Sequence, residues 1–142
     1  MNDNTTWSEL ARLPISNLED VIMARFVGRE VVAQMGFPPA FLIRLATAIS
    51  EITRNVVQHA GCPGEVQICR IAQGERVGLR IIVTDKGKGM ERSERFLEER
   101  TRGLLDSGLT DTRRLVDHFL IESAPGMGTV VTMDLWKGAP TP

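Results

Sequence analysis

Two polar residues one helical turn apart are the first candidates for chemistry. Glu51 and Asn55 lie at i and i+4 beside a regular apolar stripe, so both side chains project from one flank of a predicted helix. The carbonyl oxygen of an Asn suits Mg²⁺, which prefers oxygen ligands and accompanies nucleotide phosphates. A carboxylate one turn earlier can deprotonate or orient an attacking hydroxyl or water. The pair therefore indicates magnesium-dependent chemistry, with a solvated polar flank as the alternative.

A second candidate is the glycine-rich turn that follows a run of Val and Ile. Asp85, Gly87 and Gly89 form an Asp-x-Gly-x-Gly sequence at the predicted end of a buried strand. An Asp at that place can accept a hydrogen bond from the exocyclic amine of adenine. The glycines let the backbone approach a flat ring or a phosphate. Because Asp and Gly are also common turn residues, an ordinary turn stays open as the simpler interpretation.

Further glycines precede the last predicted helix and the last predicted strand. Gly103 and Gly108 stand before a helix that would begin near Leu109, and a helix N-terminus beside flexible glycine is a natural phosphate site. The sequence Gly-Met-Gly-Thr at 126–129 leads into the final strand. An ordinary loop-to-helix junction and a glycine hairpin are the alternatives for these two pieces.

Two predicted helices must position the first pair. After a predicted edge strand over 7–13, Asn17 is the expected N-cap of a helix, with Asp20 as its capping-box acid and Gly36 as its left-handed stop. A second helix opens at the Pro-Pro pair 38–39 and runs to about Ala60. Its apolar stripe consists of Leu42, Leu45, Ile49, Ile52 and Val56.

Strands and turns fill most of the remaining chain. The order of elements is strand, two helices, two strands, a charged loop, a helix and two strands, which predicts an α+β two-layer sandwich with a mixed, mostly antiparallel sheet. The two strands that follow the helices are predicted over 65–72 and 78–84 and form a hairpin with its turn at 73–76. The charged loop covers 90–108, and the helix after it covers 109–119. The last two strands cover 120–124 and 129–136.

Taken in order, these motifs resemble the GHKL superfamily, whose Bergerat-type ATP-binding domains occur in gyrase, Hsp90-type chaperones, histidine kinases and small anti-sigma kinases. Within it the chain is similar to the stand-alone serine/threonine kinases of partner-switching modules, of the RsbT type found in the stressosome. The resemblance spans about 15–136. It is carried by the segments DVIMARFVGR at 20–29, MGF at 35–37, TAISEITRN at 47–55, AG at 60–61 and RRLVD at 113–117.

The resemblance implies a role for each matching position. Glu51 would be the general base toward a serine or threonine of a STAS-domain partner, Asn55 would hold Mg²⁺, and Asp85 would read the adenine of ATP. Arg100 or Arg102 would neutralise the γ-phosphate. The nucleotide pocket would be shaped by Gly87, Gly89, Gly103, Gly108, Leu109 and Thr129. A PP2C-type phosphatase or a sigma-factor regulator would be a further partner.

One segment departs from the family pattern. Lids of this type typically read GGLGAGL, whereas residues 103–109 here read GLLDSGL. Asp106 places a carboxylate where phosphate oxygens are expected, and like charges there are unfavourable. The departure keeps an alternative open, in which the chain is a non-catalytic, nucleotide-gated module that sequesters or activates a regulatory partner.

Two residue groups have competing interpretations. Arg54 would either orient Glu51 or form a structural ion pair. His59, Cys62 and Cys69 would be the only basis for a metal or redox site, but they lack a Cys-x-x-Cys spacing and an obvious fourth ligand. Buried thiols and a histidine at a helix end are the expected interpretation.

Composition excludes several broad classes. With 42% hydrophobic and 25% charged residues, the chain has the balance of an ordinary globular domain, expected to span 1–142. The net charge is -1, and the arginines of the 91–102 segment alternate with glutamates, which argues against nucleic-acid binding. The polar start does not resemble a signal peptide, and no apolar run approaches the roughly 20 residues of a membrane span. We therefore expect a cytoplasmic protein.

Overall fold

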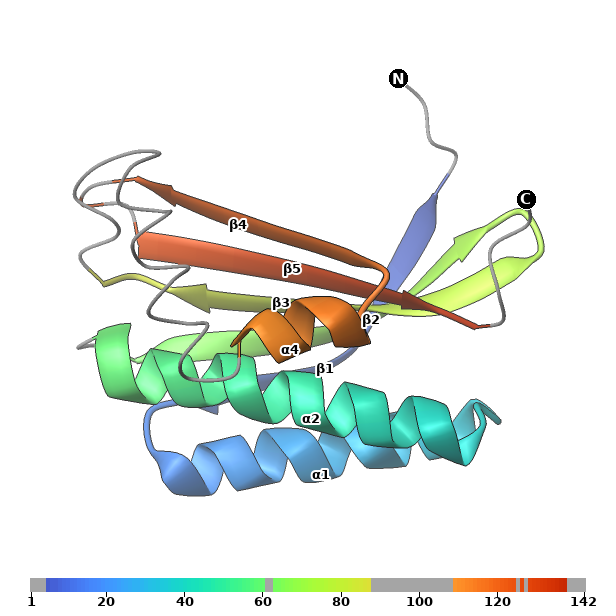
Figure 1. Ribbon diagram of the computed structural model, residues 1–142, viewed down its shortest axis with the longest axis horizontal. Coiled ribbons are helices and arrows are strands. Elements are labelled where there is room, and N and C mark those ends of the chain that lie inside the picture. The colour runs from blue at the N-terminus through green and yellow to red at the C-terminus, as the bar shows by residue number, and fades with distance from the viewer. Residues whose placement is uncertain (1–4, 61–62, 88–108, 125, 127, 138–142) are drawn as a thin grey trace.

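A five-stranded sheet carries the described helices on one face (Figure 1). The computed structural model describes residues 5–60, 63–87, 109–124, 126 and 128–137. The helices are α1 (Leu18–Gln34), α2 (Pro39–Asn55) and α4 (Leu109–Leu115), and a π-helical turn over Val56–Ala60 continues α2. The strands are β1 (Thr6–Ile15), β2 (Gly64–Gln73), β3 (Arg76–Asp85), β4 (His118–Ala124) and β5 (Gly128–Trp136).

The sheet confirms the predicted α+β two-layer sandwich. Its strand order is β1-β2-β3-β5-β4, and every neighbouring pair is antiparallel, so the sheet is not mixed over the residues described. The predicted hairpin closes at the paired residues Gln73 and Arg76, with Gly74 at a φ of 62° in the turn. The first strand lies at an edge, as predicted.

Both ends of α1 form as the sequence predicts. The side chain of Asn17 accepts a hydrogen bond from the backbone N–H of Asp20 at 2.9 Å. The carboxylate of Asp20 reaches back to the N–H of Ser16 at 2.8 Å, one residue before the cap. Gly36 has a φ of 75°, and the N–H of the following residue donates to the carbonyl of Val32. This is a Schellman stop, which needs a residue that tolerates the left-handed conformation.

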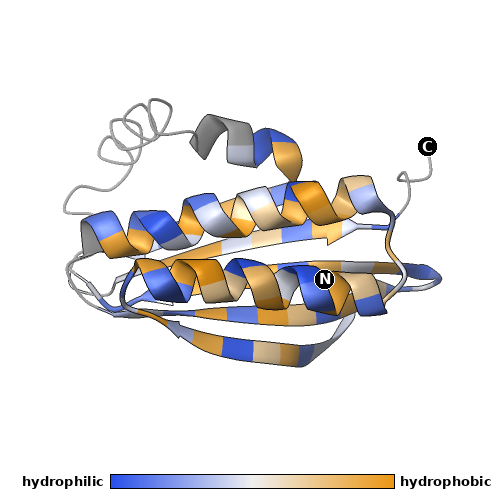
Figure 2. Cartoon of the chain, turned by 90° about the horizontal axis from the view of Figure 1, so that it is seen from below, coloured by the Kyte–Doolittle hydropathy of each residue, from blue (hydrophilic) through white to orange (hydrophobic). Residues whose placement is uncertain are grey.

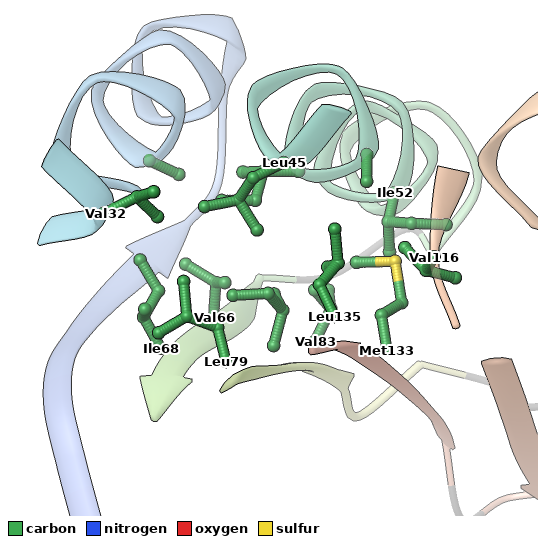
Figure 3. Close-up of a cluster of buried hydrophobic side chains, with 14 of the residues drawn as sticks. Val32, Leu45, Ile52, Val66, Ile68, Leu79, Val83, Val116, Met133 and Leu135 are labelled. Atoms are coloured by element: carbon green, nitrogen blue, oxygen red, sulfur yellow. The ribbon is translucent and has the colours of Figure 1, made fainter. Parts of the chain in front are cut away.

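The core lies between the two long helices and the inner face of the sheet (Figure 3). Gly28 lets α1 approach α2, because a Cβ at this position would lie 2.5 Å from the Cδ1 atom of Ile49. The predicted stripe of α2 is buried except for Leu42, which packs at the margin. The fully buried core side chains of the sheet are Ile15, Val66, Ile68, Leu79, Ile81, Val83, Met133 and Leu135.

The outer face of the sheet is covered by cross-strand polar pairs. Arg12 bridges Glu9 at 2.6 Å and Glu65 at 2.8 Å. Hydrogen bonds from Arg12 and then Gln67 lower the pKa of Glu9. Further along the sheet, the guanidinium of Arg80 makes two hydrogen bonds to the carboxylate of Asp134, at 2.7 and 2.9 Å. The buried apolar residues of this face are Cys69, Ile71 and Trp136, and the guanidinium of Arg76 lies over the Trp136 ring at 4.3 Å.

The helix predicted over 109–119 is too long. In the structure α4 ends at Leu115 and β4 begins at His118. The N–H of Asp117 donates to the carbonyl of Asp134 at 2.8 Å, and the Asp117 carboxylate accepts the N–H of Trp136 at 2.7 Å. Because β5 takes up the hydrogen-bonding groups of this segment, the chain leaves the helix earlier than its local pattern indicates.

Candidate functional site

Four residues on four strands form a row across one end of the sheet. Asp85 ends β3 and pairs with Gly64 of β2 on one side and with Thr129 of β5 on the other, and Thr129 pairs with Ser123 of β4. Directly paired residues project from the same face of a sheet. Asp85 continues the inward alternation of Val83, so this Asp85 row faces the helical layer.

Asp85 is buried, with 8% of the residue exposed, but only one of its two carboxylate oxygens has a hydrogen-bond partner among the described residues. One oxygen, Oδ1, accepts a hydrogen bond from the backbone N–H of Gly87 at 2.9 Å. Among the residues described, the other oxygen has no partner. This oxygen is not enclosed by the described residues, so an N–H group of a ligand can approach it.

Thr129 lies beside Asp85, and its hydroxyl is held by the hydroxyl of Ser123. The residue is 7% exposed, and its Oγ1 lies 3.0 Å from the Oγ of Ser123. Ser123 in turn donates to the carbonyl of Gly128 at 3.0 Å. Sequence reasoning missed Ser123, because only its pairing with Thr129 across the sheet marks it.

Two glycines allow the backbone to crowd around Asp85. A Cβ on Gly128, whose φ is 80°, would lie 2.0 Å from the carbonyl oxygen of Asp85. A Cβ on Gly64 would lie 2.6 Å from the carbonyl oxygen of Thr84 and 2.8 Å from a methyl group of Val56. Neither glycine was among the predicted site residues, although the 126–129 motif contained Gly128. The close contacts bring β5 and the end of α2 against the Asp85 row.

The predicted magnesium ligand lies at the end of α2 next to this row. Asn55 is the last residue of α2 and is half-buried, and it has no hydrogen-bond partner for its side chain within the described part of the chain. The following π-helical turn begins at Val56, which packs against Gly64. Such turns often occur at functional sites. Figure 1 shows the end of α2, the start of β2 and the end of β3 at the same end of the molecule.

Glu51 faces a groove between α1 and α2, which lie side by side in Figure 2. The groove has a volume of about 370 Å³ and is lined by Arg25 and Arg29 of α1 and by Glu51 and Arg54 of α2, among others. The Glu51 side chain is 25% exposed, and its Oε1 lies 3.4 Å from Nη1 of Arg54. No direct contact between Glu51 and Asp85 occurs in the described structure, and Glu51 lies one helical turn before Asn55 on α2.

The other predicted positions cannot be placed in this geometry. Gly89, Arg100, Arg102, Gly103, Asp106 and Gly108 lie outside the described residues, and Leu109 is the first residue of α4. Cys62 also lies outside them, whereas Cys69 is buried in β2. Within the described ranges, no three His, Cys, Asp or Glu residues come together as metal ligands. None of the described helices is long and apolar enough to cross a bilayer.

The residues present fit a nucleotide with its metal ion. A free carboxylate oxygen in a nearly buried site can bind an amine donor, and an unpaired amide at a neighbouring helix end can supply an oxygen ligand to Mg²⁺.

Known proteins resemble this chain over most of its length. The chain is 36% identical over 119 residues to serine/threonine-protein kinase RsbT of Bacillus subtilis (strain 168), an alignment that covers 82% of this chain and 89% of that protein. It is 28% identical over 135 residues to an anti-sigma F factor of Thermoanaerobacter sp. (strain X514), covering 88% of this chain and 91% of that protein.

A solved structure and a family match extend the comparison. The histidine kinase domain of the blue-light activated histidine kinase EL346 of Erythrobacter litoralis superposes with a TM-score of 0.51 at 28% identity, over 69% of this chain and 45% of that chain. Residues 15–135 match the histidine kinase-like ATPase domain family. With this family match over most of the chain and with these relatives, the chain belongs to the GHKL-type family of histidine kinase-like ATPase domains.

Proposed function

We propose that this protein is an ATP- and Mg²⁺-dependent serine/threonine kinase of a cytoplasmic bacterial regulatory switch. The observation that carries the proposal is the Asp85 row. Its buried carboxylate keeps one oxygen free, beside the unpartnered side chain of Asn55 at the end of α2. The similarity to a named serine/threonine kinase over most of both chains supports the same activity.

In this proposal the free oxygen of Asp85 accepts a hydrogen bond from the exocyclic amine of adenine. The Gly87 N–H holds the other oxygen, which fixes the carboxylate plane. Thr129 presents its side chain to the same pocket, and Asn55 is the protein ligand for Mg²⁺. When bound, Mg-ATP supplies the phosphoryl group and part of the charge neutralisation, while the protein contributes positioning.

Glu51 would accept the proton of the partner's hydroxyl. A carboxylate on the wall of an open groove can meet a side chain that enters from solvent, and Arg54 at 3.4 Å holds it in place. Arg25 and Arg29 line the same groove and form no ion pair with any described residue. Their charge would favour a partner segment that carries acidic residues.

The finer identity of the partners is part of the same proposal. A STAS-domain protein would carry the serine or threonine that is phosphorylated, and a PP2C-type phosphatase or a sigma-factor regulator would read the outcome. The relatives named as an RsbT kinase and as anti-sigma F factors favour switches of this kind. A nucleotide-gated module that binds its partner without phosphorylating it is the competing result.

The test separates nucleotide binding from transfer. Calorimetric titration with ATP and Mg²⁺ should give micromolar binding, about -8 kcal/mol. Asp85→Asn should weaken it at least about tenfold, because an amide replaces an acceptor oxygen by a donor nitrogen in one of its two orientations and removes the charge. Glu51→Ala should keep the binding. As a control, Glu75→Ala changes an exposed residue of the β2–β3 turn, at the opposite end of the sheet, and should behave as wild type.

Transfer is then measured with γ-labelled ATP and purified STAS-domain proteins from the same genome. The wild type should label one of them, Glu51→Ala should not, and Glu75→Ala should label it normally. Absence of binding at millimolar ATP would refute the nucleotide site. Wild-type transfer by Glu51→Ala would refute its role as the base. ATP binding without transfer, with partner binding indifferent to Glu51, would establish the non-catalytic module instead.

A further inference from the structure

The end of the sheet opposite the Asp85 row carries charged side chains on its inner face. Figure 1 shows the β2–β3 hairpin and the connection between α1 and α2 together at this end. The inward alternation of β2, β3 and β5 here reaches Arg70, Val77 and Lys137. Two cationic side chains thus take places on the face that is filled by aliphatic core residues under the helices.

These side chains line a hollow with a volume of about 610 Å³. Its other lining residues are Met35 and Phe37, at the end of α1, and Glu75 in the hairpin turn. None of the residues that line this hollow belongs to the Asp85 row or to the Glu51 groove. The hollow is therefore a second candidate binding site, separate from the one proposed for the nucleotide and the hydroxyl.

The apolar part of the hollow is held in place by the core and the sheet. Phe37 is 6% exposed, and its ring meets that of Phe41 edge-on, with the ring centroids 4.4 Å apart. Met35 and Val77 are half-buried. The backbone N–H of Lys137 donates to the carbonyl of Val77 at 2.8 Å, which fixes the chain after β5 against β3. The apolar lining is thus formed before any ligand binds.

The charged part of the hollow is exposed and unpaired. Arg70, Glu75 and Lys137 are all exposed, and their side chains form no ion pair or hydrogen bond within the described part of the chain. The Nζ atom of Lys137 lies 5.4 Å from the ring centroid of Phe37, which keeps the ammonium group beside the apolar lining. Two cations therefore face one carboxylate here, in a chain whose net charge is -1.

We propose that this hollow is a docking site for an acidic segment of a partner protein, in which carboxylates flank an aromatic or aliphatic side chain. The carboxylates would pair with the free cations of Arg70 and Lys137, and the apolar side chain would cover Phe37. Small-molecule sites usually enclose most of their ligand. Because the charged lining residues of this hollow are exposed, an extended peptide matches it better.

Glu75 makes the sign of the charge effect testable. Its carboxylate repels an acidic segment, so its removal should strengthen binding, whereas removal of a cation should weaken binding. A site that recognises a cationic segment would respond in the opposite sense. The inference does not rest on kinase activity, because no residue of the hollow takes part in it. Phosphoryl transfer at Glu51 needs no ligand in the hollow, so Glu75→Ala remains a control for that reaction.

The first test follows the backbone amide signals of the full chain by NMR during titration with an acetylated and amidated peptide of sequence DEFLED. The signals of Met35, Phe37 and Val77 should shift, with a dissociation constant below about 1 mM. Absence of shifts at millimolar peptide would overturn the proposal. Shifts confined to Arg25, Arg29 and their neighbours would assign the peptide to the Glu51 groove and overturn it as well.

Three further probes identify what the hollow recognises. The uncharged peptide NQFLQN and the peptide DEAAED, which lacks the apolar pair, should each bind at least about threefold more weakly than DEFLED. Equal binding of NQFLQN would refute the role of the cations, and equal binding of DEAAED would refute the role of the apolar lining. Phenylacetate that shifts the same signals with equal affinity would make a small carboxylic acid, instead of a protein segment, the occupant.

Charge variants locate the contact. Arg70→Gln and Lys137→Gln should each weaken binding of DEFLED at least about threefold, and Glu75→Gln should strengthen it about twofold. Arg114→Gln is the matched control, since Arg114 is an exposed arginine on α4, and it should bind as wild type.

The same variants can contradict the proposal. Unchanged binding in Arg70→Gln and Lys137→Gln, or weaker binding in Glu75→Gln, would place the peptide elsewhere. An equal loss in Arg114→Gln would reduce the effect to the net charge of the chain. Because the altered side chains are exposed and unpaired, every variant should unfold at the wild-type temperature, and thermal unfolding checks that a loss of binding is not a loss of folding.

Discussion

Substitution of Gly128 by alanine probes how closely β5 approaches Asp85. Gly128 has a φ of 80°, and a Cβ there would meet the Asp85 carbonyl oxygen at 2.0 Å and the Cα of Lys86 at 2.9 Å. Both neighbours are backbone atoms, so no side-chain rotation can relieve the contact. Gly126 is a matched control, because it has a φ of 75° but no atom within 4 Å of the added Cβ.

Both substitutions place a Cβ on a residue in the left-handed region, but only Gly128→Ala also forces backbone atoms apart. Alanine in the left-handed region costs about 1–2 kcal/mol at either position. At Gly128 the strands must also move apart, and overpacking of this kind costs about a further 1–3 kcal/mol. We therefore expect Gly126→Ala to destabilise the fold by about 1–2 kcal/mol and Gly128→Ala by about 2–5 kcal/mol. For a domain of this size each kcal/mol lowers Tm by about 2–4 °C.

Two measurements check this expectation. Urea unfolding followed by circular dichroism gives the two free energies of unfolding, and ATP titration reports whether Asp85 has moved. Gly128→Ala should be less stable than Gly126→Ala by at least about 1 kcal/mol and should bind ATP more weakly. Equal stability of the two variants would refute the close approach of β5 to the end of β3. Unchanged ATP affinity in a clearly destabilised Gly128→Ala would instead separate this contact from the nucleotide site.

Two further predictions concern the sheet and the helix pair. Burial, and then the charge of Glu9, raise the pKa of the Cys69 thiol, so it stays protonated to higher pH than a free cysteine. Its labelling by iodoacetamide at pH 8, followed by peptide mass spectrometry, should be at least about tenfold slower in the folded protein than in urea; equal rates would show that Cys69 is not buried. Gly28→Ala should destabilise the fold because its Cβ meets the Cδ1 atom of Ile49. Ile49→Val removes that atom. The double variant should therefore lose about 1 kcal/mol less stability than the two single variants lose in sum. Simple additivity in the urea midpoints would show that the two side chains do not collide.

Local patterns in the sequence were sufficient for most elements. The Asn17 cap, the Gly36 stop and the turn at Gly74 each depend on residues within a few positions, and all three form as predicted. The apolar stripe of α2 follows from helical spacing alone. The order of elements, with the Asp85 motif at a strand end, was enough to predict the α+β sandwich and the superfamily. These features are local because capping, turn geometry and amphipathic spacing are set by near neighbours.

Long-range pairing decided the rest. The helix predicted to reach Phe119 stops at Leu115, because β5 supplies hydrogen-bond partners that no local pattern reveals. Likewise, the hydroxyl of Ser123 lies beside the site only because Ser123 pairs with Thr129 across the sheet.

The sequence alone determined which residue types are available for nucleotide chemistry and which helix carries Glu51 and Asn55. Only the tertiary structure decided that Gly64, Asp85 and Thr129 stand in one row, and that Glu51 lines a groove between α1 and α2. The physical reason is that strand neighbours and helix crossings arise from burying apolar faces across the whole chain. Residues far apart in sequence are thereby brought into contact, and their spacing along the chain carries no record of it.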